Sequence, residues 1–179
     1  MKATINVAHS KFLLAVLICL VVAIGCGMSV AQTTAAQSDA QKAFEKLKTT
    51  VGSWQGTMMG KSISFTVRLM SSGNTILQEA NSGSPPPDHE ITTFYLDGDR
   101  LLATHYCDGG NRVRWEGKMS PDGKAIEFSF LDIAGGTQRG FVKHTVFSIV
   151  DANKQVIEFT FIMPDGKPLE LRGEFERTK

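Results

Sequence analysis

Residues 169–177 read LELRGEFER and contain the clearest periodic pattern of the chain. Apolar or small residues from Leu169 to Phe175 alternate with charged residues from Glu170 to Glu176. Successive side chains of a β-strand point to opposite faces of a sheet, so this period of two indicates one buried and one solvated face. The segment therefore predicts a β-strand.

The same alternation recurs along the chain, in residues 62–69 (SISFTVRL), 126–130 (IEFSF) and 157–161 (IEFTF). Turn-forming residues separate such segments at positions 71–74, 97–99, 108–111, 121–123 and 164–166. Glycine permits positive φ and proline presets a turn, so each separator predicts a hairpin connection. Counting the runs between turns gives roughly ten strands, each antiparallel to its neighbours in the chain.

A single helix is predicted before the strands. Ser38 and Gln41 have the spacing of a capping box, and Phe44, Leu47 and Val51 fall at helical intervals along one face. Gly52 is expected to end this helix, and no second helical pattern follows.

A long antiparallel meander leaves two exposed edges, and closure into a barrel removes both of them. The sequence therefore predicts an all-β fold, a single antiparallel up-and-down β-barrel of roughly ten strands with one N-terminal helix. This barrel domain is expected to comprise residues 38–179.

The first residues are predicted to be a secretory signal peptide, residues 1–31. Lys2 and Lys11 precede or border the apolar run FLLAVLICLVVAIG at 12–25, and Ala31 follows at a suitable cleavage position. Residues 32–37 then form a flexible tail, and the protein is exported to the periplasm or secreted. The alternative is lipid attachment at Cys26, in the lipobox-like AIGC. The protein is expected to contact a membrane only if this lipid is attached.

Composition and charge argue against a nucleic-acid partner and against a disulfide bond. Cleavage removes Lys2 and Lys11 from the 19 basic residues, which leaves the chain near neutrality against 18 acidic ones. With no basic run, we expect no nucleic-acid partner. Cys107 becomes the only cysteine, so no intramolecular disulfide can form.

Residues 101–111 (LLATHYCDGGN) gather a histidine, a tyrosine and a cysteine before a glycine turn. An even-numbered loop would place His105 opposite Arg114 and Tyr106 opposite Val113, so that His105 shares a cationic face with the arginines. That face would suit a carboxylate ligand. One extra turn residue would invert this arrangement.

Neither catalysis nor a metal site is predicted for this region. His105 and Cys107 share one face of the strand, but no third group is evident to orient the histidine. The remaining candidates, His89 and His144, lack the spacing of metal ligands.

Gly52-Ser53-Trp54 directly follows the helix and opens the first strand. A G-x-W at this place before an antiparallel meander resembles the calycin group, which includes lipocalins, fatty-acid-binding proteins and nitrobindin-like barrels. Residues 104–112, with THYC, GN and an arginine, resemble small secreted bacterial calycin-like domains of unknown function.

The resemblance implies two further expectations. In calycins an arginine of the last strand covers the tryptophan at the base of the barrel, which nominates Arg177 above Trp54 as the structural closure. Nitrobindin-like barrels bind haem through a histidine near the chain end, whereas the last histidine here is His144. We therefore expect no cofactor.

The resulting hypothesis is an exported, non-catalytic barrel that binds a small apolar or amphipathic ligand in its interior. The residues expected to contact the ligand are Trp54, Tyr95, His105, Tyr106, Arg114, Trp115, Phe128 and Phe159. One alternative is a structural or partner-binding envelope protein whose barrel is filled by side chains. A third hypothesis is an enzyme that uses the region of His105 and Cys107.

Export predicts a specific N-terminus. Intact-mass measurement of the protein purified from its native envelope should give a chain that begins at Gln32. A diacylglycerol-modified Cys26 at the N-terminus would contradict this prediction and make the protein membrane-tethered.

Overall fold

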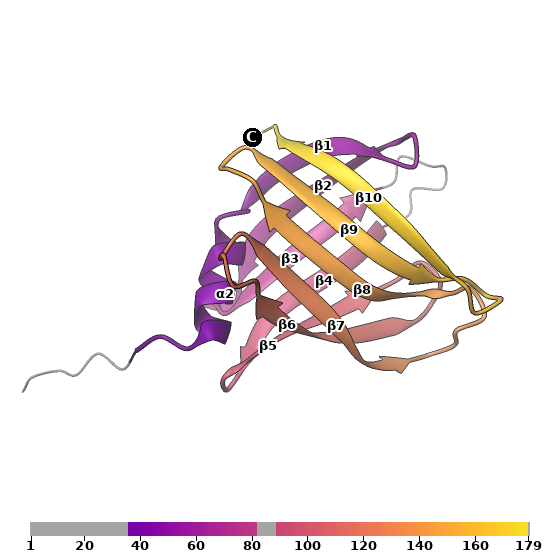
Figure 1. Cartoon of the computed structure of the whole chain (residues 1–179), viewed down its shortest axis with the longest axis horizontal. Coiled ribbons are helices and arrows are strands. Elements are labelled where there is room, and N and C mark those ends of the chain that lie inside the picture. The colour runs from indigo at the N-terminus through magenta and orange to yellow at the C-terminus, as the bar shows by residue number, and fades with distance from the viewer. Residues whose placement is uncertain (1–35, 82–88, 179) are drawn as a thin grey trace, which may run out of the picture. The chain divides into compact units, whose positions relative to one another are not determined.

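The computed structural model describes residues 36–81 and 89–178. Within them, ten strands form one closed barrel in which chain neighbours pair antiparallel and β1 pairs with β10 (Figure 1). The predicted all-β barrel of roughly ten strands with one N-terminal helix is confirmed. Residues 1–31, with the predicted signal peptide and Cys26, lie outside the described residues, as does most of the predicted tail.

The elements follow one another without a crossover. They are α2 (Asp39–Lys48), β1 (Gly52–Met58), β2 (Lys61–Met70), the 3-10 turn η1 (Ser71–Gly73), β3 (Thr75–Asn81), β4 (His89–Asp97), β5 (Arg100–Tyr106), β6 (Arg112–Met119), β7 (Ala125–Ala134), β8 (Phe141–Ile149), β9 (Lys154–Ile162) and β10 (Pro168–Arg177).

The capping box predicted for the helix is present. Gln41 N–H donates to Ser38 Oγ at 3.2 Å, and Ser38 N–H donates to Gln41 Oε1 at 3.0 Å. The helix ends at Lys48, earlier than predicted, and Val51 is exposed rather than on its apolar face. The hydroxyl of Thr50 donates to the Leu47 carbonyl, which satisfies a terminal helix carbonyl without another helical turn.

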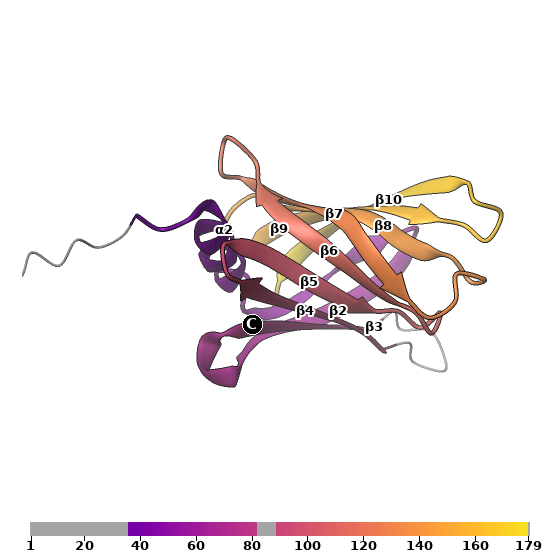
Figure 2. The same ribbon diagram turned by 90° about the horizontal axis from the view of Figure 1, so that it is seen from below.

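Helix α2 packs against β4, β5 and β6 and thereby distinguishes the two ends of the barrel (Figure 2). We call the end beside α2 the helix end; it carries the turns β2–β3, β4–β5, β6–β7 and β8–β9. We call the opposite end the distal end; it carries the turns β1–β2, β5–β6, β7–β8 and β9–β10. In the described part of the chain, no helix has the length and hydropathy needed to span a membrane.

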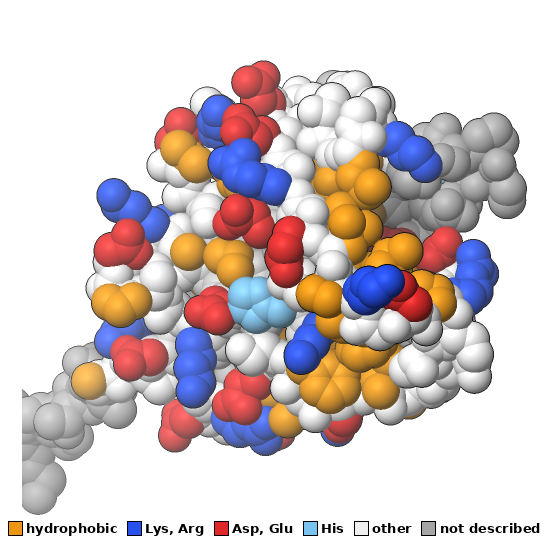
Figure 3. Space-filling model, turned by 45° about the vertical axis from the view of Figure 1, so that its right-hand side comes forward, with side chains coloured by type: hydrophobic (Ala, Val, Ile, Leu, Met, Phe, Trp, Pro, Cys, Tyr) orange, Lys and Arg blue, Asp and Glu red, His pale blue; other side chains and the backbone are white. Residues whose placement is uncertain are grey.

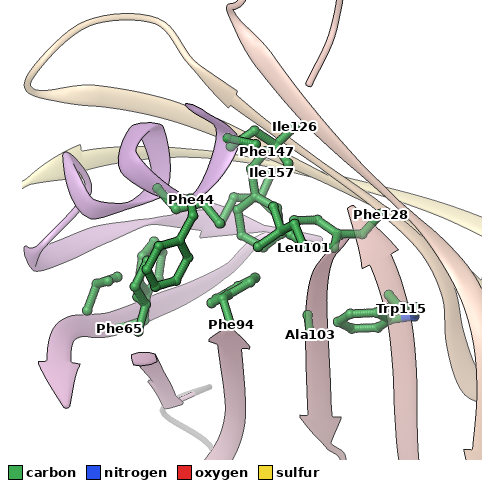
Figure 4. Close-up of a cluster of buried hydrophobic side chains, with 14 of the residues drawn as sticks. Phe44, Phe65, Phe94, Leu101, Ala103, Trp115, Ile126, Phe128, Phe147 and Ile157 are labelled. Atoms are coloured by element: carbon green, nitrogen blue, oxygen red, sulfur yellow. The ribbon is translucent and has the colours of Figure 1, made fainter. Parts of the chain in front are cut away.

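Aromatic side chains fill the barrel toward the helix end (Figure 4). The ring centroids of Phe94, Phe128 and Phe147 lie 5.4–5.7 Å from one another, and all three side chains are buried. A Cβ added to Gly117 would come within 2.6 Å of the Phe128 ring. The packing at this end therefore does not even accommodate an extra methyl group at Gly117 without a shift of its neighbours.

The barrel closes where the first strand meets the last. Trp54 of β1 lies opposite Arg177 of β10, and the guanidinium carbon of Arg177 sits 4.4 Å from the centroid of the indole. The same guanidinium donates hydrogen bonds to the carbonyls of Ala152 at 2.7 Å, Thr49 at 2.9 Å and Val51. The stacking predicted for this pair is thus present, and Arg177 also joins the β8–β9 turn to the segment between α2 and β1.

This geometry predicts strong coupling between the two residues. Trp54→Ala should lower the free energy of unfolding by about 3–5 kcal/mol, and Arg177→Ala by about 1–2 kcal/mol. Residues in contact are non-additive, so urea unfolding of the double variant should show less than the sum of the two losses.

Arg172→Ala is the matched control, because Arg172 lies on the same strand but is exposed and pairs with surface carboxylates. It should cost less than about 1 kcal/mol. Additive losses for Trp54 and Arg177, or an equal loss for Arg172, would show that the stack does not couple the first strand to the last.

Candidate functional site

The hairpin between β5 and β6 contradicts the predicted register. Five residues, 107–111, connect the strands, so His105 lies opposite Val113 and Tyr106 lies opposite Arg112. Cys107 N–H donates to the Asn111 carbonyl at 3.1 Å, and Gly110 N–H donates to the Cys107 carbonyl at 3.0 Å. The odd-numbered loop shifts the pairing by one residue and thereby reverses which side chains share a face.

The predicted cationic face is therefore wrong. Arg114 points to the outer surface, where its guanidinium pairs with Asp132. Tyr106 is exposed, and Tyr95 lies on the outer face with its hydroxyl 3.3 Å from Thr104 Oγ1. Tyr95, Tyr106 and Arg114 do not line the interior.

His105, in contrast, points into the barrel and is only 5% exposed. Its ring stacks on Trp115, with centroids 5.2 Å apart and an interplanar angle of 21°. Nδ1 lies 3.0 Å from Thr92 Oγ1, whereas the buried Nε2 has no hydrogen-bond partner. Burial lowers the pKa of His105 to about 4, so the imidazole is neutral at physiological pH.

Glu90 and Cys107 complete a cluster around this nitrogen. Glu90 Oε1 lies 4.0 Å from His105 Nε2 and 3.6 Å from Cys107 Sγ. One ligand atom from each of the three residues lies within 4.8 Å of the other two. A carboxylate, an imidazole and a thiol are all possible metal ligands, and we call this set the Glu90–His105–Cys107 cluster.

The thiol itself is a poor nucleophile. Burial raises the pKa of Cys107 to about 12, and the neighbouring Glu90 and Asp108 carboxylates act in the same direction. The thiol contacts Glu90 and Asp108, and it accepts a hydrogen bond from Gly109 N–H at 3.4 Å. Nucleophilic cysteines require the thiolate, which these surroundings disfavour.

Glu90 and Thr92 were not among the predicted site residues. The turn at 97–99 carries the signal that could have found them, because Asp97 pairs with Arg100 across a two-residue turn. Counting back along both strands places Thr92 opposite His105. Glu90, two residues before Thr92 on β4, shares its face of the sheet.

The remaining predicted residues divide between the two ends. Trp54 and Phe128 are buried in the packed half of the barrel, with exposures of 1% and 0%. Trp115 lies beside Ala103 (Figure 4) and stacks on His105. Phe159 is half-buried on the inward face of β9. The structure thus brings His105 and Trp115 into contact and leaves Phe159 as a separate part of the barrel wall.

Side chains from the β5–β6 hairpin also bridge an interruption in the barrel wall. The pairing of β7 with β8 extends from Ala125 only to Ser129, and beyond it β7 continues beside β6. Asn111 Nδ2 donates to the Gly140 carbonyl at 2.8 Å, and Trp115 Nε1 donates to the Val142 carbonyl at 3.1 Å. These two side chains satisfy carbonyls of β8 and the preceding turn where ladder bonds to β7 are missing.

The outer surface has its own concavity. A groove of about 350 Å³ lies over β1, β2 and β3, and its outward-facing lining residues include Ser53, Gln55, Ser64, Thr66 and Glu79. The buried residues Trp54 and Phe65, which alternate with these outward-facing side chains, also contribute to the lining of the groove.

Comparisons with known proteins support the fold. No family model matches the chain, and no curated protein matches it. Its structure is similar to that of Rv2717c from M. tuberculosis, with a TM-score of 0.56 and 14% identity over 76% of this chain and 98% of that one.

It also resembles a protein of unknown function from the DUF3598 family of Nostoc punctiforme, with a TM-score of 0.51 and 13% identity. That match covers 74% of this chain and 49% of the other. At these identities the similarity shows a shared β-barrel fold only. Membership of the calycin group stays an expectation from the sequence.

The bridge from Asn111 yields a stability prediction. Asn111→Ala should leave the buried Gly140 carbonyl without its donor and cost about 1–3 kcal/mol. Amide hydrogen exchange should accelerate in β8 near Val142, while the exposed control Asn74→Ala changes stability by less than about 0.5 kcal/mol. Unchanged exchange in β8 would show that Asn111 does not secure this part of the wall.

Proposed function

We propose that this protein is an exported, non-catalytic barrel that binds a small amphipathic molecule at its distal end. The observation that carries the proposal is a difference in the burial of the inward-facing side chains between the two ends of the barrel. Most are buried in the aromatic core near the helix end, whereas several on β2, β9 and β10 are only half-buried toward the distal end.

Strand β9 illustrates this change. Ile157 is 1% exposed, whereas Phe159 and Phe161, which follow it on the same inward face, are half-buried. Ile63 and Leu171 are likewise half-buried on neighbouring strands of this region. Incompletely buried apolar side chains above a filled core offer an apolar molecule a surface to cover.

The rim of the distal end adds further apolar area. Met59 and Met163, in the β1–β2 and β9–β10 turns, are 67% and 39% exposed. Figure 3, in which the right-hand side of Figure 1 is turned forward, shows hydrophobic side chains gathered at the right of the view beside charged ones. An amphipathic ligand suits such a surface, because its apolar part can cover the hydrophobic residues while its polar part meets the charges.

Two features support a non-catalytic role. The raised pKa of Cys107 disfavours a thiolate, and the thiol's hydrogen-bond contacts are with Glu90, Asp108 and Gly109 rather than with His105.

Export is proposed from the apolar run at 12–25 and the small residues that follow it. A filled barrel that binds a protein partner is the second candidate, supported by the tight packing of the helix end.

The two tryptophans allow a direct test, because Trp115 bonds to Val142, the strand partner of Phe161, whereas Trp54 lies at the closure of β1 with β10. Sodium dodecanoate titrated into Trp54→Phe, in which only Trp115 emits, should give a saturable change in emission with one molecule bound per chain. The same titration into Trp115→Phe should leave the emission of Trp54 almost unchanged, because Trp54 lies beneath Arg177 at the barrel closure, away from the proposed ligand.

Phe161→Glu should weaken dodecanoate binding by at least about tenfold, because it places a negative carboxylate in the apolar surface that is proposed to bind the dodecanoate anion. Met70→Glu, an exposed apolar residue at the helix end, is the matched control and should bind as tightly as the parent. Absence of saturation, or equal effects of the two substitutions, would contradict binding at the distal end.

A further inference from the structure

We propose that the Glu90–His105–Cys107 cluster is a binding site for a divalent transition-metal ion, with Zn²⁺ as its best match. Carboxylate oxygen, imidazole nitrogen and thiolate sulfur are the three ligand types that zinc sites use. This inference goes beyond the proposed binding of an amphipathic molecule and does not depend on it.

The distances fit a tetrahedral ion. Zinc–ligand lengths of about 2.0 Å for O, 2.1 Å for N and 2.3 Å for S imply separations of about 3.3 Å between N and O and about 3.5 Å between S and O. The corresponding separations in the cluster are 4.0 Å and 3.6 Å. All three ligand atoms lie within 4.8 Å of one another, so side-chain shifts on the order of 1 Å would bring them to coordination distance.

The surroundings of His105 orient its ring and leave Nε2 available to bind a metal ion. Its Nε2 is buried and has no hydrogen-bond partner, which is costly for a polar atom and calls for a ligand. Its other nitrogen, Nδ1, lies 3.0 Å from Thr92 Oγ1, and stacking on Trp115 fixes the ring plane. A hydrogen bond to the second nitrogen is the usual device that orients a metal-binding histidine and leaves the first nitrogen's lone pair free.

The cysteine becomes a ligand only when the metal arrives. As the zinc–sulfur bond forms, the thiol releases its proton to solvent, because the cation stabilises the thiolate directly. The Gly109 N–H that donates to the sulfur supports the same negative charge. Three protein ligands leave the fourth tetrahedral position open to water or to the polar group of a bound molecule.

The site can be tested with metal alone. Full-length protein kept under reducing conditions should bind one Co²⁺ per chain, with a sulfur-to-cobalt charge-transfer band that Zn²⁺ abolishes by displacement. Cys107→Ser should remove that band, and Glu90→Gln and His105→Gln should each abolish stoichiometric binding. Thr92→Val should weaken binding by about 10–100-fold, because it removes the group that orients His105.

His144 and Glu127 provide the matched control, since Nε2 and Oε1 lie 2.8 Å apart on the outer face without a cysteine. His144→Gln should leave binding unchanged, and Zn²⁺ should raise the melting temperature of parent and control alike but not that of the three ligand variants. Circular dichroism of each metal-free variant establishes that it folds. A folded parent without the charge-transfer band, or binding lost in His144→Gln and retained in His105→Gln, would overturn the metal site.

Discussion

The pairing of β1 with β10 is the constraint on which the other features of this molecule depend. A closed barrel has no free edge, so its register at each strand pair must be consistent around the whole ring. Arg177 secures this junction by covering Trp54 and by bonding to carbonyls on both sides of the seam. Closure then fixes which residues of every strand point inward.

The inward-facing residues differ between the two ends of the interior. Near α2, aromatic rings pack closely enough that Gly117 has no space for a side chain. Toward the distal end, the ladder between β7 and β8 is interrupted, and Asn111 and Trp115 replace its hydrogen bonds. The closest aromatic packing thus lies near α2, while the half-buried apolar wall and the polar cluster border this core toward the distal end.

Much of the fold could be predicted because it depends on local patterns. The alternation in residues 169–177 and the glycine- and proline-rich turns suffice to predict antiparallel strands, and Ser38 with Gln41 predicts the start of the helix. The candidate site was harder, because one additional loop residue between β5 and β6 reverses the faces of His105 and Tyr106. Nothing in the local sequence distinguishes Glu90. It lies near His105 because it shares a face of β4 with Thr92, the strand partner of His105.

The central claim is that the protein binds its ligands at the distal end, rather than in the barrel core or the outer groove, and that the Glu90–His105–Cys107 cluster there takes a metal ion. Anomalous diffraction at the zinc edge, from crystals of the protein grown with Zn²⁺, tests this claim most directly. The account predicts one strong peak among Glu90 Oε1, His105 Nε2 and Cys107 Sγ. A map with no peak there, in which zinc occupies only the surface pair of His144 and Glu127, would contradict it.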